Sequence, residues 1–362
     1  MTAVLDTVIV GAGQVAQAHA RALAASPHVR LAAVVEPDPV AREAFARRHG
    51  APAAYADLDT LLTAMRPDLA HICSPPGVHA DQAIACLDAG AWVMCEKPLC
   101  GGLAELDRIA AAERRSGARC AGVAQWRFSP RTQRLRDLID RQAFGRPLAV
   151  SVETAWFRDE AYYAAPWRGR WESELGGPTV GVGIHLMDLA LWLLGDWVDV
   201  AALASTLDRE IDVEDVSVAA VRFASGALAT VVNSVLSPRE ESRLRIDFQY
   251  ATVEFNALYS EAPGDWRLTA RPGYEPLLSA WEREAGAGPS RMTRQFGRFA
   301  SAALGEGDVE VSLDEVRPVL DLVSSLYKSA ATGNVVRRGS IAPGDPFYAR
   351  VSGDLGPGAF RP

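Results

Sequence analysis

His185, Asp188 and Lys97 are the residues whose types and spacing indicate proton chemistry. His185 and Asp188 stand three residues apart in a helical pattern, so one helix would present both from adjacent turns. Lys97 stands in the tripeptide Glu96-Lys97-Pro98. A lysine base at pH 7 would need a pKa shift of roughly three units, or about 4 kcal/mol, whereas a histidine needs almost none. We therefore expect His185 to act as general acid/base and charged Lys97 to orient and polarise a reacting oxygen.

Each of these residues also has another interpretation. The helical pattern around His185 continues through Leu189 and Trp192, which would equally suit a core histidine. Asp188 would serve either to bind a substrate hydroxyl or as a structural acid. Lys97 could itself relay the proton, or be an ordinary solvated lysine. The functional interpretation of His185 depends on the presence of Lys97 as a second candidate catalytic residue.

Alternating strands and helices occupy the first third of the chain. The apolar runs are Thr7 to Val10, Leu31 to Val35, Leu69 to Cys73 and Ala91 to Cys95, and helical patterns separate them. This alternation predicts an α/β domain with a doubly wound parallel sheet, a Rossmann-type domain over residues 1–123.

A glycine-rich hexapeptide, Gly11-Ala12-Gly13-Gln14-Val15-Ala16, follows the first strand and opens a helix. A G-x-G-x-x-G/A fingerprint in that context predicts dinucleotide binding. Gly11 permits the tight turn, Gly13 lets backbone N–H groups approach a pyrophosphate, and Ala16 keeps the helix close to the sheet. The expected cofactor contacts in this loop are Gly11, Gly13, Gln14 and Val15.

Glu36 ends the second strand roughly twenty residues past Ala16, where an acid accepts hydrogen bonds from the adenosine ribose diol. An acid there would repel a 2′-phosphate, so the sequence favours NAD(H) over NADP(H).

Polar residues follow the fourth and fifth strands. Ser74, Pro75 and His79 come after the fourth, and Glu96 and Lys97 after the fifth. Doubly wound sheets bind ligands at the carboxyl edge of their strands, so we expect these five residues to contribute to the cofactor site. His79 would equally suit a helix-capping or core histidine.

Longer alternating strands begin after Val123: Leu148 to Phe157, Val216 to Phe223, Ala227 to Val235 and Arg243 to Phe248. They predict a mostly antiparallel sheet and hence an α+β domain over residues 124–340. Residues 341–362 are rich in Gly and Pro and predict a C-terminal arm rather than core.

Composition excludes several classes of partner. The 362-residue chain has a formal net charge of -8, which disfavours nucleic acid. No apolar stretch approaches the roughly 20 residues of a membrane helix, so no membrane partner is expected. Five cysteines show no Cys-x-x-Cys and no metal spacing with histidine, which indicates neither disulfides nor a metal site. We expect a cytoplasmic protein.

The chain resembles the glucose-fructose oxidoreductase and inositol dehydrogenase family, Gfo/Idh/MocA, up to about Val336. The matching landmarks are Gly11 to Ala16 with His19, Ser74-Pro75 with His79, Ala89-Gly90 before Glu96-Lys97-Pro98, Gln125 to Pro130, Gly176-Gly177, Gly183-Ile184-His185, Asp188, Tyr327 to Ala330, and Gly333. The resemblance implies an N-terminal Rossmann domain, a C-terminal domain with a large open sheet, bound NAD(P), and a homodimer or homotetramer formed through that sheet. It also implies hydride chemistry at a secondary alcohol of a sugar or cyclitol, and often a cis Lys97–Pro98 bond.

Three further residues are candidates for substrate contact beside Asp188. Trp167 and Arg168 lie in an aromatic and basic loop of the kind that stacks on a sugar ring or packs over nicotinamide, although packing of the loop on the core would suit them equally. Arg127 follows the sixth strand at the domain junction, where a cation would face a ligand.

Gly181 departs from the family pattern, which usually has an acid four residues before the histidine. Loss of an orienting acid can cost several kcal/mol of transition-state stabilisation, so another group compensates or the chemistry has changed. The candidates to compensate are Asp188, Glu172, Glu174 or a substrate hydroxyl. Glycine would also open space beside His185 for a larger or differently oriented substrate.

The expected function is NAD(H)-dependent hydride transfer to or from a secondary alcohol carbon of a sugar, cyclitol or glycoside. Two alternatives stay open: a redox-neutral NAD-dependent elimination or glycoside cleavage, and a weakly catalytic nucleotide-binding sensor, which only Gly181 supports.

Overall fold

The computed structural model describes residues 4–257, 262–282 and 289–362. The chain divides into two compact units, the first of Met1–Gln125 with Pro289–Arg317 and the second of Trp126–Gly288 with Pro318–Pro362. The first unit thus includes a late segment that we expected in the second domain, 124–340.

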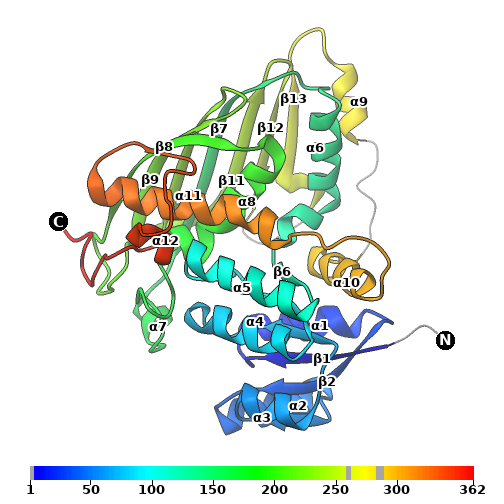
Figure 1. Cartoon of the computed structure of the whole chain (residues 1–362). Helices are drawn as coiled ribbons and strands as arrows, with labels where there is room; N and C mark the ends of the chain where they lie inside the picture. Colours follow the sequence, from blue (N-terminus) through cyan, green and yellow to red (C-terminus); the bar gives the residue numbers. More distant parts are fainter. Residues whose placement is uncertain (1–3, 258–261, 283–288) are drawn as a thin grey trace. The chain divides into compact units, whose positions relative to one another are not determined.

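A six-stranded parallel sheet forms the first unit, with the strand order β3-β2-β1-β4-β5-β6. This confirms the predicted doubly wound sheet. Figure 1 shows its strands β1 and β2 in blue. The strands are β1 Leu5–Val10, β2 Val29–Val35, β3 Ala53–Tyr55, β4 Leu69–Ile72, β5 Trp92–Cys95 and β6 Cys120–Gly122. The helices of the N-terminal segment are α1 Gln14–Ala24, α2 Pro39–His49, α3 Leu58–Ala64, α4 His79–Asp88 and α5 Leu103–Ser116.

Helix α10, Arg291–Ala303, explains why the late segment belongs to the first unit. Its Phe296 and Phe299 pack in one buried cluster with residues of the parallel sheet, among them Leu69 and Met94. Gln295 Nε2 donates to the Gly122 carbonyl at 2.8 Å, so α10 also satisfies the end of β6. The core of the Rossmann unit is therefore completed by a helix distant in sequence, because burial of its aromatic face is favourable.

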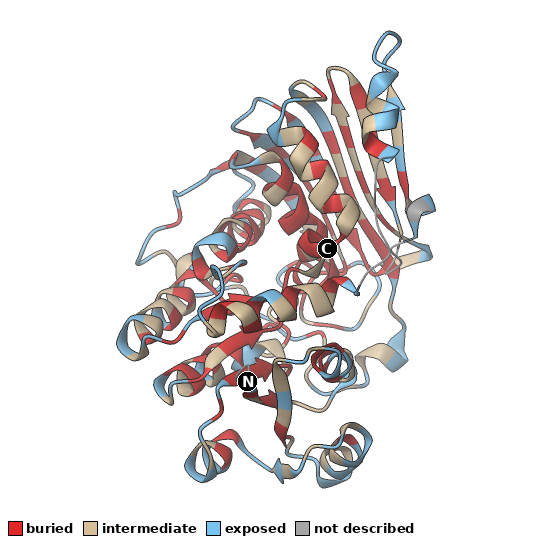
Figure 2. Ribbon diagram, turned by 90° about the vertical axis from the view of Figure 1, so that its right-hand side faces the viewer, coloured by how far each residue is buried: buried red, intermediate tan, exposed pale blue. Residues whose placement is uncertain are grey.

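An eight-stranded, mostly antiparallel sheet forms the second unit, in the order β13-β12-β11-β7-β10-β9-β8-β14. Its one parallel pair joins β10 to β7. Buried and exposed residues alternate along these strands, as expected of a sheet with one covered face (Figure 2). The strands are β7 Pro147–Phe157, β8 Trp197–Ser205, β9 Val216–Phe223, β10 Leu228–Ser234, β11 Leu236–Phe248, β12 Ala251–Asn256, β13 Trp266–Ala270 and β14 Val336–Arg337.

Among the described residues, six helices accompany this sheet along the chain. They are α6 Pro130–Asp140, α7 Glu160–Tyr163, α8 Ile184–Leu194, α9 Pro276–Glu282, α11 Leu313–Thr332, whose first five residues belong to the first unit, and α12 Pro346–Ala349. Across the described ranges, no helix combines the length and apolarity needed to cross a bilayer.

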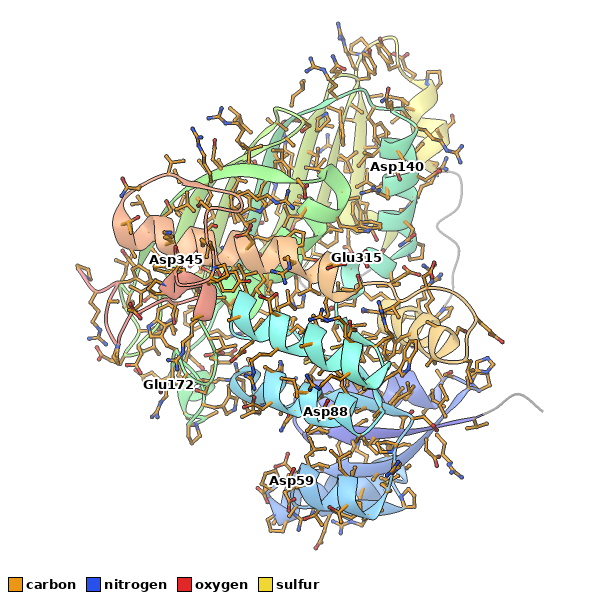
Figure 3. All side chains as sticks on the ribbon, in the orientation of Figure 1. Asp59, Asp88, Asp140, Glu172, Glu315 and Asp345 are labelled. Atoms are coloured by element: carbon orange, nitrogen blue, oxygen red, sulfur yellow. The ribbon has the colours of Figure 1, made fainter. Side chains whose placement is uncertain are left out.

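The C-terminal segment differs from the arm that its Gly and Pro content predicted. Phe347, Val351 and Phe360 are buried, and the Thr206 N–H donates to the Phe360 carbonyl at 3.0 Å. Asp345, labelled in Figure 3, pairs with Lys328 of α11. The segment thus packs as part of the second unit, because a few well-spaced aromatic residues are enough to bury a turn-rich chain.

Candidate functional site

The loop after β1 has the geometry of an anion site. Gly11 has φ +98°, and a Cβ there would lie 2.8 Å from the Cys73 carbonyl oxygen, so only glycine fits this close approach to β4. At Gly13, the N-cap of α1, a Cβ would meet nothing within 4 Å and no side chain caps the helix. Gln14 and Val15 are exposed in the first turn. The N–H groups at this helix end therefore fit a pyrophosphate.

Glu36 lies beside that loop. Its Oε2 accepts the Ala12 N–H at 2.9 Å and its Oε1 accepts the Asp38 N–H at 3.1 Å. The Arg42 guanidinium donates to the Glu36 carbonyl at 2.7 Å, which fixes the turn between β2 and α2. The carboxylate is thus held at the mouth of the glycine loop, where a ribose diol would meet it.

Glu36→Ala should weaken NADH binding by about 10- to 100-fold, because hydrogen bonds to a charged carboxylate contribute roughly 1.5–3 kcal/mol each. NADPH binding should change little or improve, since a repelling charge is removed. Fluorescence titration with both nucleotides measures the change. Glu43→Gln is the matched control, because Glu43 carries the same charge on the exposed face of α2 and pairs with Arg47. A clear preference of the wild-type protein for NADPH would contradict the assignment.

His79 connects the segments after β4 and β5. Its Nδ1 lies 2.8 Å from the Pro98 carbonyl oxygen and its Nε2 lies 2.8 Å from the Ser74 carbonyl oxygen. Burial lowers the pKa of His79, so the neutral ring donates to one of these carbonyls. The Ser74 hydroxyl donates to Gln82 at 2.6 Å, and Pro75 precedes a short turn. His79 therefore braces the two loops from the core.

Glu96 and Lys97 follow β5 at the same carboxyl edge of the sheet as the glycine loop. Glu96 is buried, and it accepts a hydrogen bond from the Lys97 main-chain N–H at 3.1 Å. Lys97 is half-buried, and its bond to Pro98 is cis, as the resemblance implies.

A compositional signal also singles out Lys97. The chain has 37 Lys and Arg residues, and lysine occupies only positions 97 and 328. Lys328 pairs with Asp345. Arginine supplies the positive charge at the other basic positions, and the ammonium of a lysine differs from a guanidinium in being a compact point charge.

His185 is the second residue of α8. Its neighbours in the helix, Ile184 and Leu186 to Leu191, are buried, whereas His185 is half-buried. A π-helical turn, Thr179–Gly183, leads into the helix. His185 is therefore more exposed than the helix residues on either side of it.

Buried Glu214 anchors this turn, and the sequence analysis missed it. It accepts the N–H groups of Gly177 at 3.0 Å and Thr179 at 3.1 Å and the Tyr327 hydroxyl at 2.9 Å. A Cβ on Gly177 would collide with the Glu214 carbonyl oxygen, which explains the glycine. Burial raises the pKa of Glu214. The signal available in the sequence was an acidic pair, Glu214-Asp215, at the start of an apolar strand.

Arg127 and Asp188, two predicted substrate contacts, bind each other. Arg127 Nε donates to Asp188 Oδ2 at 2.9 Å and Nη2 donates to Oδ1 at 2.5 Å. Both side chains are buried. The bidentate pair ties α8, one turn after His185, to the turn that precedes α6.

Asp188→Asn should lower the free energy of unfolding by about 3–5 kcal/mol, because it leaves the buried guanidinium without its counter-charge. Urea unfolding measures the loss. The double variant Arg127→Met with Asp188→Leu should be less destabilised than the sum of its single changes. An unchanged stability together with a raised KM would instead place Asp188 at the substrate.

Arg168 lies between two aromatic rings. Its guanidinium carbon is 3.7 Å from the ring centroid of Tyr162 and 4.2 Å from that of Trp167, and it pairs with Glu174 at 3.0 Å. The Gly169 N–H also donates to Glu174 at 2.5 Å. This loop is therefore ordered by cation–π and ionic contacts of its own.

The structure narrows the candidates that would compensate for Gly181. Asp188 is engaged by Arg127, and Glu174 by Arg168. Glu172 is exposed in the loop after α7 (Figure 3). A Cβ at Gly181 would meet nothing within 4 Å, so the glycine leaves open space on the turn before His185. Glu172 and a substrate hydroxyl therefore remain as the two candidates.

Neither metals nor thiols mark a further centre in the described part of the chain. No group of three or more His, Cys, Asp or Glu residues there is arranged to hold a metal ion. All five cysteines are free and buried, and burial raises the pKa of Cys86 and Cys100 to about 12, which makes these thiols unreactive.

Comparison with known proteins agrees with both units. Residues 5–123 match the family model for the oxidoreductase family with an NAD-binding Rossmann fold, and residues 132–254 match that for the GFO/IDH/MocA C-terminal domain. D-glucoside 3-dehydrogenase of Escherichia coli K12 is 26% identical over 92% of this chain and 97% of its own length. Inositol 2-dehydrogenase of Rhizobium meliloti is 30% identical over 62% of this chain and 67% of its own.

Among solved structures, WlbA dehydrogenase from Bordetella pertussis in complex with NADH and UDP-GlcNAcA has a TM-score of 0.83 and 27% identity, covering 93% of this chain and 99% of that one. The chain belongs to the Gfo/Idh/MocA family of oxidoreductases, and its first unit is an NAD-binding Rossmann fold.

Proposed function

We propose that this protein catalyses NAD-dependent hydride transfer at a secondary alcohol carbon of a sugar or glycoside, with Lys97 and His185 acting on the reacting oxygen. The observation that carries the proposal is the shared sheet edge in the first unit. At this edge, the uncapped helix end at Gly13 follows β1, and the loop that bears Lys97 follows β5. Both strands are neighbours of β4 in the parallel sheet.

Gly11, Gly13 and Glu36 would hold the cofactor, whose nicotinamide supplies the hydride acceptor or donor. His185 takes the hydroxyl proton from the substrate as general base, and returns it in the reverse direction. The ammonium of Lys97 donates a hydrogen bond to the same oxygen and stabilises the negative charge that develops there.

The full-length relatives favour a sugar or glycoside over a free cyclitol. The Escherichia coli relative is a glucoside dehydrogenase, and the Bordetella pertussis protein was solved with a nucleotide sugar. Both alignments span more than nine tenths of this chain, whereas the inositol dehydrogenase aligns over 62%. The long alignments include the second unit, which carries His185.

We also propose that the protein forms a homodimer or homotetramer through the open face of the second sheet. Leu203 and Val218 stand opposite each other on β8 and β9 and are 74% and 45% exposed, and Leu228 on β10 is 62% exposed. Apolar residues on one exposed face favour association. Light scattering measures the mass, and a monomer at micromolar concentration would contradict the proposal.

A substrate screen tests the function directly. Aldoses, glycosides, nucleotide sugars and cyclitols are incubated with NAD, and both NADH and non-redox products are measured. Stoichiometric NADH with a keto-sugar product supports the proposal. Turnover without net NADH would indicate a redox-neutral elimination or glycoside cleavage, and absence of both products would indicate a sensor.

A further inference from the structure

His71 is a buried polar residue that the proposed mechanism does not use. It lies in the middle of β4, where its strand partners are Ile9 of β1 and Met94 of β5. Its side chain is 1% exposed and Phe296 of α10 packs on it, with ring centroids 4.7 Å apart. An apolar residue would fill this position at no cost in desolvation, so the imidazole must gain a hydrogen bond to be tolerated.

That hydrogen bond begins a chain of buried polar groups. His71 Nδ1 lies 3.0 Å from His19 Nδ1, and His19 Nε2 lies 2.9 Å from Glu96 Oε1. The other carboxylate oxygen, Glu96 Oε2, accepts the main-chain N–H of Lys97. His19 is fully buried, and its ring also contacts Phe296 at 4.5 Å between centroids. These hydrogen bonds therefore connect the interior of β4 to the loop that carries Lys97.

Proton positions follow from the partners. Glu96 is acceptor-only when ionised, so His19 must present its Nε2–H to it. Burial, and to a lesser degree the neighbouring His19, lowers the pKa of His71 well below its usual range, so the His71 ring is neutral. A neutral ring can either donate its Nδ1–H to His19 or accept the Nδ1–H of a charged His19, and both arrangements fix the orientation of the His19 ring. Other ionisable side chains also feel the charge of Glu96: burial raises the pKa of the Cys73 and Cys95 thiols and lowers that of His79.

We propose that His71 is a positioning residue for Lys97, acting through the hydrogen-bonded chain His71–His19–Glu96. His71 holds the His19 ring, His19 holds the Glu96 carboxylate, and Glu96 holds the main chain at Lys97 so that the ammonium meets the reacting oxygen. This inference rests on the proposed role of Lys97.

Two polar variants and one apolar variant of His71 separate hydrogen bonding from packing. The amide of His71→Asn stands as many bonds from Cα as Nδ1 and can still bond to His19, whereas the amide of His71→Gln reaches one bond too far. His71→Leu removes the polar group. Phe296→Leu is the packing control. It loosens the contact with the His19 and His71 rings and removes no group that takes part in the hydrogen bonds from His71 to Glu96.

Kinetics and spectroscopy together test the inference. We expect His71→Leu and His71→Gln to lower kcat by roughly 10- to 100-fold with little change in KM or NADH affinity, because a small misplacement of a reacting group has that effect. His71→Asn should stay within about threefold of wild type, and Phe296→Leu should lower thermal stability without that loss of kcat. Ring-nitrogen NMR spectra of the cofactor-free protein labelled with ¹⁵N-histidine should show altered His19 nitrogens in the Leu and Gln variants only.

The other outcomes separate failure of the positioning role from failure of the proposed function. Unaltered His19 signals in His71→Leu, or equal losses of kcat in the Asn and Gln variants, would overturn the proposal that His71 positions Lys97 through His19 and Glu96. If His71→Leu alone fails to fold, the comparison of Asn with Gln decides. If the spectra change and Lys97→Ala is inactive while His71→Gln turns over like wild type, the positioning role is wrong and the proposed function stands. If Lys97→Ala is itself fully active, the proposed function has failed and this inference with it.

Discussion

Lys97→Ala should lower kcat by about 10²- to 10³-fold, because it removes the charged donor that stabilises the developing alkoxide. That loss corresponds to about 2.7–4 kcal/mol of transition-state stabilisation. NADH affinity should change little, since the glycine loop and Glu36 hold the nucleotide. Single-turnover kinetics with the best substrate from the screen measure the chemical step without product release.

Lys97→Arg then distinguishes charge from proton relay. Arginine keeps the positive charge but cannot lose its proton near neutral pH and presents a planar fork in place of a compact ammonium. Partial activity in this variant would assign Lys97 a purely electrostatic role. Lys328→Arg is the matched control, because Lys328 is the only other lysine and pairs with Asp345 within the second unit. Full activity of Lys97→Ala would refute the assignment.

His185→Ala should lower kcat for oxidation by about 10²- to 10⁴-fold, the usual contribution of a positioned general base. In the wild-type protein, kcat/KM for oxidation should fall at low pH, because only the neutral ring accepts a proton. The variant should lose this limb of the profile.

Added imidazole supplies a further test of the same step. The His185→Ala variant leaves space at a half-buried position of α8, so exogenous imidazole should restore part of the activity with the pH dependence of imidazole itself. His28→Gln is the control for loss of a histidine elsewhere, since His28 lies in the turn between α1 and β2. An unchanged pH profile in His185→Ala would show that another group is the base.

The nucleotide loop was predictable from sequence because every requirement it meets is local. Gly11 must adopt a positive φ, and Gly13 must leave the helix end open. Both requirements can be recognised from a short sequence motif. The same holds for the parallel sheet, whose strands and helices alternate within short segments. The half-buried position of His185 was not predictable, because almost every other residue of its helix is buried.

The partners of the charged residues were decided by contacts between distant segments. The sequence left Asp188 open as a substrate ligand or a structural acid, and only the fold shows that Arg127, 61 residues earlier, binds its carboxylate. Glu214 was passed over because its three donors come from residues 177, 179 and 327. Likewise, the sequence predicted that the terminal aromatic residues belong to a C-terminal arm, whereas Phe360 packs against Tyr327.

The amino-acid sequence by itself determined the family, the parallel sheet, the dinucleotide loop and the candidate pair Lys97 and His185, since these depend on residue types at short spacing. Only the tertiary structure decided which acids are engaged, that α10 completes the Rossmann core, and that His71 and His19 lead to Glu96. The physical reason is that a buried charge or imidazole must find a partner, and which partner it finds depends on segments that folding brings together.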